Sequence, residues 1–306
     1  DDTKEIIATN NSPDIPFGAS LNPYRGCEHG CIYCYARPTH EYLGFSAGLD
    51  FESCIMVKYD AAKKLRAKLQ SPTWEPQAIA MSGVTDCYQP AERKLQITRG
   101  CLEVLAAFRN PVGIITKNYL VTRDIDHLKE LARYGAASVT LSITTLDRDL
   151  ARIMEPRTSS PPRRLQAIEE LANAGIPVGV NVAPIIPGLT DHECVSILKA
   201  AKEAGATHAG FTIVRLPYGV KDLFQEWLVQ HFSDRKEKVL NKIRDIRNGK
   251  LNDADFGKRF RGEGNYARQI ADLFSVHCKR LGFNKHRMRL STAHFINPYN
   301  HQLNLF

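Results

Sequence analysis

Three cysteines lie close together near the start of the chain, and their spacing could hold a metal centre. Cys27, Cys31 and Cys34 form the pattern C-x3-C-x2-C. Thiolate is a soft ligand that selects zinc, copper(I) or iron–sulfur clusters. Because a closed zinc or iron–sulfur site needs four ligands, three cysteines leave one metal position open to a substrate.

A zinc knuckle is the alternative to an open iron–sulfur site. Its fourth ligand would be His29, His40 or Cys54. Zinc sites usually show two paired ligand motifs, and no second pair follows the cysteine run. The pattern therefore favours an iron–sulfur cluster.

A recurring unit of strand and helix must position this loop. From residue 78 to 215, short β-branched runs alternate with helical stretches, and Thr190 with Glu193 predicts a capping box at the start of one helix. Such alternation indicates a parallel sheet. With the cysteine-bearing segment as the first unit we count six, so we expect an α/β fold, a partial (βα)6 TIM-like barrel. The expected strands are 78–81, 112–116, 138–143, 178–183 and 208–214.

The net charge of +8 is confined to the C-terminal part of the chain. Residues 1–215 carry 24 Lys+Arg and 24 Asp+Glu, whereas residues 216–306 carry 17 and 9. A basic segment with interleaved aromatic residues suits phosphate backbones and unstacked bases, although a solvated helical surface is the alternative. We expect four parts: an N-terminal extension (1–19), the barrel (20–230), a helical basic C-terminal region (231–301) and a terminal peptide (302–306).

The composition also indicates where the protein works. The chain has no signal peptide and no apolar run near the length of a membrane span. Eight cysteines without a secretory signal indicate the reducing cytoplasm, and metal binding or catalysis rather than disulfides. We therefore expect a cytoplasmic protein with no membrane partner.

The cysteine motif, with Tyr33 directly before the last cysteine, resembles that of the radical S-adenosylmethionine (SAM) superfamily. Residues 31–35 look like the cluster motif of spore photoproduct lyase and its relatives, and further matches follow in order at 85–90, 116–117 and 155–158. The resemblance spans roughly residues 20–230 and points to a bacterial, lyase-related branch. It implies a [4Fe–4S] cluster on the three cysteines, SAM on the fourth iron, and a 5′-deoxyadenosyl radical that abstracts hydrogen from a substrate.

Residues at the expected strand ends are candidates for contacts to SAM. Ser82, Gly83 and Thr85 end the second strand, where the superfamily binds the amino group of SAM, and Gly83 would let the backbone approach closely. Lys117 ends the third strand and could pair with a carboxylate or phosphate, or form a surface salt bridge. Ser142 and Thr144 are candidates for contacts to the ribose hydroxyls, and Asn181 and Val182 for contacts to adenine, each with a structural role as its alternative. Tyr33 is a further candidate for cofactor contact.

The hydrogen-atom donor is the least certain assignment from the motif. In spore photoproduct lyase a cysteine near this stretch returns a hydrogen atom to the product radical, assisted by a tyrosine. The aligned position here is Ser82, so Cys87 is the displaced candidate, followed by Tyr35 and Tyr88. The candidates for nucleic-acid contact are Arg157, Arg215, Lys258, Arg259 and Arg261; for Arg157 and Arg215 the alternative is that they stabilise loops.

The last five residues carry a second motif. They resemble the peptide that bacterial repair proteins insert into the sliding clamp, with Leu305 and Phe306 as apolar anchors, Gln302 fixing the register, and Leu303 beside it. The alternative is a terminal strand that folds back onto the core.

We thus expect a radical SAM enzyme, a lyase that repairs a UV-type thymine lesion in DNA with electrons from a flavodoxin- or ferredoxin-type donor. The alternatives are radical modification of RNA or protein, and a non-enzymatic, zinc-stabilised DNA and clamp adaptor.

Overall fold

A seven-stranded sheet organises the chain, and the computed structural model describes it over residues 3–297. The strands run in the order β1-β2-β5-β6-β7-β8-β9, and the six from β2 to β9 are parallel. β1 pairs antiparallel with β2 at one edge. The strands are β1 (Ile7–Thr9), β2 (Ala19–Leu21), β5 (Ile79–Met81), β6 (Val112–Thr116), β7 (Ala137–Ile143), β8 (Val178–Ile185) and β9 (His208–Ile213).

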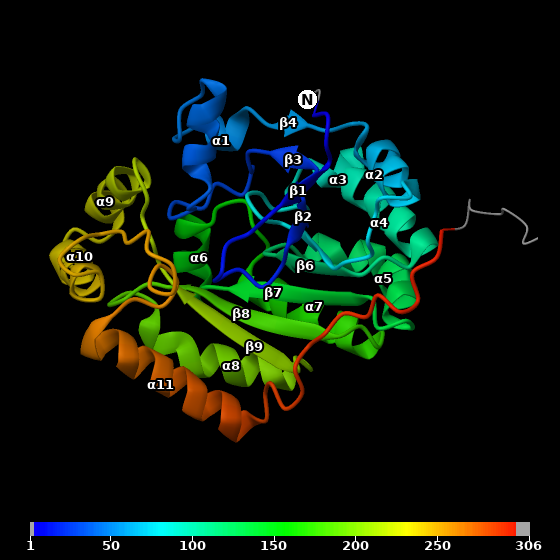
Figure 1. The fold of residues 1–306 in the computed structure, drawn as a ribbon. Coiled ribbons are helices and arrows are strands. Elements are labelled where there is room, and N and C mark those ends of the chain that lie inside the picture. The colour runs from blue at the N-terminus through cyan, green and yellow to red at the C-terminus, as the bar shows by residue number, and fades with distance from the viewer. Residues whose placement is uncertain (1–2, 298–306) are drawn as a thin grey trace, which may run out of the picture.

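This open sheet confirms the expected partial barrel. The six parallel strands match the six expected units, and β1 and β9 stand at opposite ends of the order (Figure 1). The five strands expected from β-branched runs begin and end within two residues of the observed ones. β1 was not expected, because three residues in the N-terminal extension show no alternation.

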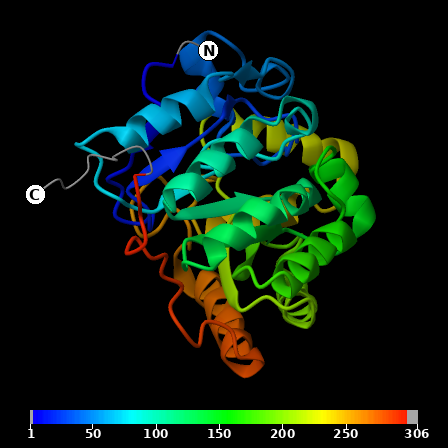
Figure 2. The same cartoon turned by 90° about the vertical axis from the view of Figure 1, so that its right-hand side faces the viewer.

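Helices follow the strands and cover the outer face of the sheet (Figures 1 and 2). Their apolar stripes pack on the strands; in α7, for example, Ala167, Ile168 and Leu171 are fully buried. They are α2 (Ala61–Gln70), α3 (Glu92–Leu95), α4 (Ile97–Phe108), α5 (Ile125–Ala132), α6 (Arg148–Met154), α7 (Pro161–Asn173) and α8 (Cys194–Glu203), with the 3-10 helices η2 (Tyr119–Asp124) and η3 (Asp191–Glu193). Among residues 3–297, no helix has the length and apolar character needed to cross a membrane.

The expected capping box before α8 is wrong. The Thr190 hydroxyl accepts a hydrogen bond from the Ile186 amide (2.9 Å) instead of capping the helix. The Glu193 carboxylate accepts from Thr145 and Leu146 in the neighbouring loop, at 2.5 and 2.7 Å. Glu193 therefore joins two strand-end loops, which the local pattern does not reveal.

The basic C-terminal region shares the core of the barrel. It contains α9 (Val220–His231), α10 (Lys236–Asp245) and α11 (Gly264–Leu281). α11 packs on α8 and β9, and its Ile270 and Phe274 belong to the main hydrophobic core. The Phe274 ring lies 4.6 Å from that of Phe211 in β9.

After α11 the chain forms a strap (residues 283–297) along the amino ends of the strands. The Ser291 amide donates to the Gly135 carbonyl at 2.9 Å, and the Ile296 amide donates to the Phe108 carbonyl at 3.0 Å. Figure 1 shows the strap in red, passing from α11 toward α5. The strap lies at the end of the sheet opposite the cysteine loop.

Phe274→Ala tests whether α11 is part of the core. Removing this buried ring leaves a cavity against Phe211, so we expect the free energy of unfolding to fall by about 3–5 kcal/mol in urea titrations. Val276→Ala on the exposed side of the same helix is the control, because Val276 is 61% exposed. Equal losses for both variants would contradict the packing of α11 against β9.

Candidate metal centre and active site

The cysteine loop lies across the carboxyl ends of the parallel strands. It follows β3 (Tyr24–Arg25), which pairs with β4 (Met56–Val57) in a small second sheet. The Thr85 hydroxyl, after β5, donates to the Gly26 carbonyl at 2.5 Å. The Tyr35 hydroxyl donates to the Gly83 carbonyl at 2.8 Å. Active sites of βα barrels form at this end of the strands.

The three thiols fit an iron–sulfur cluster in which each cysteine binds a different iron. Cys27 and Cys31 are 7% exposed, and Cys34 is partly buried between them and Phe51. Burial raises the pKa of all three thiols, so metal binding must displace their protons. Within residues 3–297, no three His, Cys, Asp or Glu side chains surround a position for a single metal ion. A cluster does not require such a position, because each thiolate binds a separate iron.

The two histidines among the candidate fourth ligands for zinc have other partners. The ring of His29 lies 3.2 Å from the Asn118 amide nitrogen and 3.4 Å from Asp86, and burial lowers its pKa. His40 is fully buried, with its Nε2 3.0 Å from the Cys54 carbonyl oxygen. His29 instead links the loop to the ends of β5 and β6.

Arg37 holds the cysteine loop in place through hydrogen bonds, a role that the sequence did not predict. This fully buried side chain lies in the 3-10 helix η1 (Arg37–Leu43). Its Nε donates to the Cys31 carbonyl at 3.0 Å and its Nη2 to the Gly30 carbonyl at 3.1 Å. It also donates to the Gly48 carbonyl at 2.8 Å and pairs with Glu52 of α1 (Asp50–Ser53) at 2.9 Å. One guanidinium therefore satisfies the carbonyls that the loop buries.

Arg157, a candidate for nucleic-acid contact, braces the same loop. It pairs with Glu52 and donates to the Glu28 carbonyl. Gly30, with φ of +66°, lies directly beneath this ion pair, and a Cβ there would collide with both partners. The charge of Arg157 is thus compensated within the protein, which does not favour a role in phosphate binding.

Arg37→Met tests this support. Because the buried carbonyls would lose their donor and Glu52 would keep only Arg157, we expect the free energy of unfolding to fall by about 3 kcal/mol or more. The iron bound per chain after reconstitution should fall at least severalfold. Arg133→Met is the control, because Arg133 is exposed and pairs only with Glu130 one turn away on α5. Normal iron content in Arg37→Met would contradict the assignment.

Lys117 lies in a buried polar network. Its ammonium lies 3.3 Å from Glu155 and donates to Thr144 (3.2 Å) and to the Ala183 carbonyl (2.9 Å). The Tyr33 hydroxyl donates to Glu155, and Arg164 pairs with the other carboxylate oxygen. Burial opposes ionisation of Glu155, but Arg164 and Lys117 hold its pKa well below the usual range. Lys117, Thr144 and Tyr33 are therefore brought together, with the charge of Lys117 compensated.

A Cβ on Gly83, just after β5, would make only ordinary van der Waals contacts. Its amide donates to the Asn22 side chain at 2.8 Å, and a Cβ on it would meet no described atom nearer than 3.5 Å. Packing of the described residues thus does not demand glycine here, in keeping with a ligand that approaches this backbone. Ser82, just before it, has φ of +94°, in the left-handed region that non-glycine residues seldom adopt.

Two of the three candidate hydrogen donors are enclosed in the core. Cys87 and Tyr88 are fully buried. The Cys87 sulfur lies behind Ser82, whose hydroxyl donates to it at 3.4 Å, and Tyr88 donates to Asp124 at 3.1 Å. Tyr35 is 45% exposed. Of the three, only Tyr35 is accessible from the mouth of the site.

The ribose and adenine candidates divide between two faces of the sheet. Ser142 of β7 and Asn181 of β8 are register partners, so their side chains share one face. Val182 follows Asn181, points to the opposite face and belongs to the hydrophobic core. The structure therefore brings Ser142 and Asn181 together, but not the Val182 side chain.

Arg215 has no charged partner among residues 3–297. It follows β9, and its guanidinium lies 4.5 Å from the centre of the Tyr35 ring. Its Nε is buried without a hydrogen-bond partner, and burial lowers its pKa. By contrast, Lys258 pairs with Glu263 at 3.1 Å and Arg259 pairs with Asp14.

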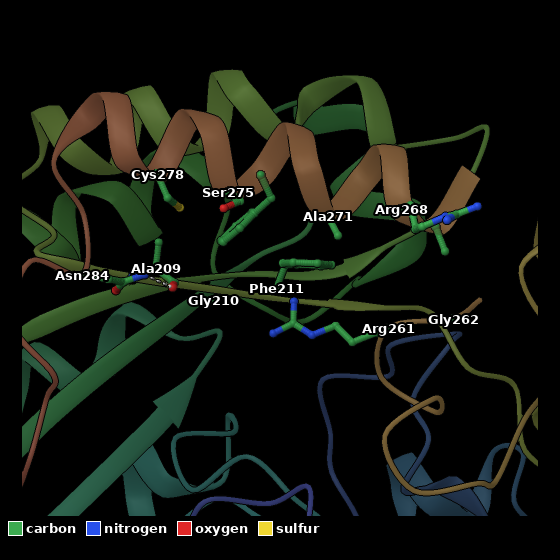
Figure 3. A pocket seen from close by; sticks show the side chains of 12 residues that line it. Ala209, Gly210, Phe211, Arg261, Gly262, Arg268, Ala271, Ser275, Cys278 and Asn284 are labelled. Atoms are coloured by element: carbon green, nitrogen blue, oxygen red, sulfur yellow. Dashed lines mark hydrogen bonds between the residues drawn. The ribbon is translucent and has the colours of Figure 1, made fainter. Parts of the chain in front are cut away.

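Arg261 reaches a separate cavity between β9 and α11. This cavity has a volume of about 510 Å³ and lies at the sheet edge; none of the three loop cysteines lines it (Figure 3). Arg261 stacks on Phe211, 3.9 Å from the ring centre, and Asn284 hydrogen-bonds the Ala209 backbone at the other end. Arg261 is therefore not part of the site beside the cysteine loop.

A family model confirms what the cysteine loop suggests: residues 21–201 match the radical SAM superfamily. The chain belongs to the radical SAM superfamily. Its cofactors are those of the family, a [4Fe–4S] cluster and SAM. The alternative of a zinc-stabilised, non-enzymatic adaptor is therefore wrong.

The relatives of this radical SAM enzyme are diverse. An uncharacterized protein of Mycobacterium tuberculosis is 37% identical over 222 residues, which cover 72% of this chain and 65% of that protein. The chain thus spans slightly less than two thirds of that relative. A protein of Pseudomonas phage M6, named radical SAM Nα-GlyT isomerase, is 25% identical over 223 residues, 72% of this chain and 44% of that protein.

Solved structures of spore photoproduct lyase share the fold. One, complexed with dinucleoside spore photoproduct, has a TM-score of 0.62 at 17% identity, covering 92% of this chain and 79% of the lyase. Another, a variant with bound AdoMet and dinucleoside spore photoproduct, has a TM-score of 0.61 at 17% identity, covering 89% and 78%. At this identity the likeness establishes the fold alone. Gln302, Leu303, Leu305 and Phe306 lie outside the described residues, so the clamp peptide stays a prediction.

Proposed function

We propose that this radical SAM enzyme acts on an altered thymine in DNA, in the manner of spore photoproduct lyase. The observation that carries the proposal is the uncompensated guanidinium of Arg215 beside the accessible Tyr35. A half-buried cation whose Nε lacks a hydrogen-bond partner is costly unless a ligand supplies the anion. The phosphodiester between two nucleosides carries one negative charge and matches it. The shared fold with a lyase solved with a dinucleoside photoproduct supports this substrate class.

Within this proposal, Cys27, Cys31 and Cys34 bind the cluster, and Gly83 and Asn181 line the SAM site. When bound, the two cofactors supply one-electron reduction and abstraction of a hydrogen atom from the substrate. Arg215 orients the substrate through its phosphate. A soluble flavodoxin- or ferredoxin-type protein would supply the electron, as the family resemblance implies.

We assign Tyr35 as the side chain that returns a hydrogen atom; one electron from the flavodoxin- or ferredoxin-type donor and one proton from solvent then restore its phenol. Its phenol lies at the mouth of the site and is held by the Gly83 carbonyl, whereas the Cys87 thiol is enclosed behind Ser82. The remaining cysteines outside the loop are Cys54, which is partly buried, and Cys101, Cys194 and Cys278, which are buried.

The second candidate is an isomerase that returns the same hydrogen atom to its substrate. The name of the phage relative and the enclosure of the Cys87 thiol behind Ser82 favour it. An isomerase needs no donor side chain, so the fate of solvent deuterium separates the two candidates.

Turnover with UV-irradiated DNA tests the substrate. We expect reconstituted enzyme under anaerobic, reducing conditions to form repaired thymidine and 5′-deoxyadenosine. Arg215→Gln should lower kcat/KM by about 10- to 100-fold, because a charge-assisted bond to phosphate is lost. Arg152→Gln is the control, since Arg152 is 76% exposed and pairs with Asp149 on α6. Turnover of RNA or a protein substrate, but not DNA, would overturn the proposal.

Turnover in D2O tests the donor. The phenolic hydrogen of Tyr35 exchanges with solvent, so the wild-type product should carry one deuterium by mass spectrometry. Tyr35→Phe should abolish this label and Cys87→Ala should retain it. Loss of the label in Cys87→Ala would assign the thiol instead. An unlabelled wild-type product would favour the isomerase.

A further inference from the structure

Aromatic rings and guanidinium groups alternate in a column beside the cysteine loop. Arg215 lies between two rings, 4.5 Å from the centre of Tyr35 and 5.2 Å from that of Phe260. Arg259 lies between Phe260 and Phe256, 4.8 Å from the ring centre of the first and 4.9 Å from that of the second. The five side chains therefore form a stacked column from the surface to the tyrosine that follows the last loop cysteine.

The N-terminal segment fixes the outer half of this column. Asp14 pairs with Arg259, accepting from its Nε at 2.8 Å, and accepts from the Gly257 amide at 3.3 Å. Ser12 accepts from the same guanidinium at 2.7 Å. The hydrogen bond from Arg259 lowers the pKa of Asp14 to about 2, so the pair is fully charged at neutral pH. The column is thus ordered before any ligand arrives, which reduces the entropy cost of binding.

The ends of the column are open to solvent. Phe256 is 59% exposed and Tyr35 is 45% exposed. An exposed ring at the end of a stack offers a flat face to another planar group. Arg259 is neutralised by Asp14, whereas Arg215 has no charged partner within residues 3–297. The column therefore presents a stacking face and one free positive charge, which together match a nucleotide: a planar base and a singly charged phosphodiester.

We propose that the stacked column binds an unpaired DNA strand, with a base on the outer face of Phe256 and a phosphodiester on Arg215, and so leads the strand to Tyr35. This inference rests on the proposed function and specifies the form of its substrate. The enzyme would bind the DNA as an unpaired strand, because stacking within a duplex covers the face of the base that Phe256 would contact.

Binding of a labelled single strand tests the column without turnover. The reconstituted holoenzyme is titrated anaerobically into a fluorescein-labelled thymidine oligonucleotide of about ten residues, followed by anisotropy. Phe256→Leu keeps the apolar side chain but removes the ring, and should raise Kd by about 5- to 100-fold. Phe256→Trp should bind at least as tightly as wild type. An abasic strand of the same length should bind both wild type and Phe256→Leu equally weakly.

Tyr59→Leu is the matched control, because Tyr59 is a comparably exposed aromatic residue (69%) after β4. It should leave Kd within about twofold. Equal effects of Phe256→Leu and Tyr59→Leu, equal binding of abasic and normal strands, or tighter binding of duplex or RNA than of single-stranded DNA would each overturn the column as a DNA site. Single-strand binding that depends on Phe256 without turnover of UV-irradiated DNA would retain the column and overturn only the proposed lesion chemistry.

Discussion

The geometry of the metal centre depends on the satisfaction of buried carbonyl groups. A loop that encloses three thiols has no regular hydrogen bonding of its own, so its carbonyls need donors from elsewhere. Arg37 supplies them from the turn that follows the last cysteine, and Glu52 anchors the guanidinium from the next helix. The hydrogen bonds of Arg37 thereby fix the conformation of the loop. The parallel sheet supplies the strand ends that face the open metal position.

Charge compensation distinguishes support from function around this loop. Lys117 pairs with Glu155, which it shares with Arg164; Arg157 pairs with Glu52, which it shares with Arg37; and Arg259 pairs with Asp14. Each of these cations joins segments that are distant in the sequence. Arg215 differs because the described residues offer it only aromatic rings. A guanidinium without an ion-pair partner among the described residues selects ligands by charge as well as by shape, and this supports an anionic phosphodiester.

Local sequence patterns predicted the helices and strands better than they predicted which side chains contact one another. The β-branched runs located five strands, because burial on both faces of a parallel sheet leaves a clear signature. The three cysteines were predicted from spacing alone. The capping box at Thr190 failed, since Glu193 bonds a loop nearly fifty residues earlier in the chain. For the same reason the sequence left open whether Arg157 binds phosphate or stabilises a loop, and it could not reveal that Cys87 lies behind Ser82. Such roles depend on tertiary contacts, which no short segment encodes.

The strap at the end of the described chain has a consequence for synthesis on the ribosome. Its contacts join residues 291 and 296 to residues 135 and 108, which are made much earlier. The amino ends of β6 and β7 therefore remain uncovered until residues 291 and 296 have emerged. Contacts of such long sequence separation form late and slowly. A nascent chain of this enzyme would expose apolar strand ends for longer than one whose sheet closes in order, and would depend more on chaperones during that interval.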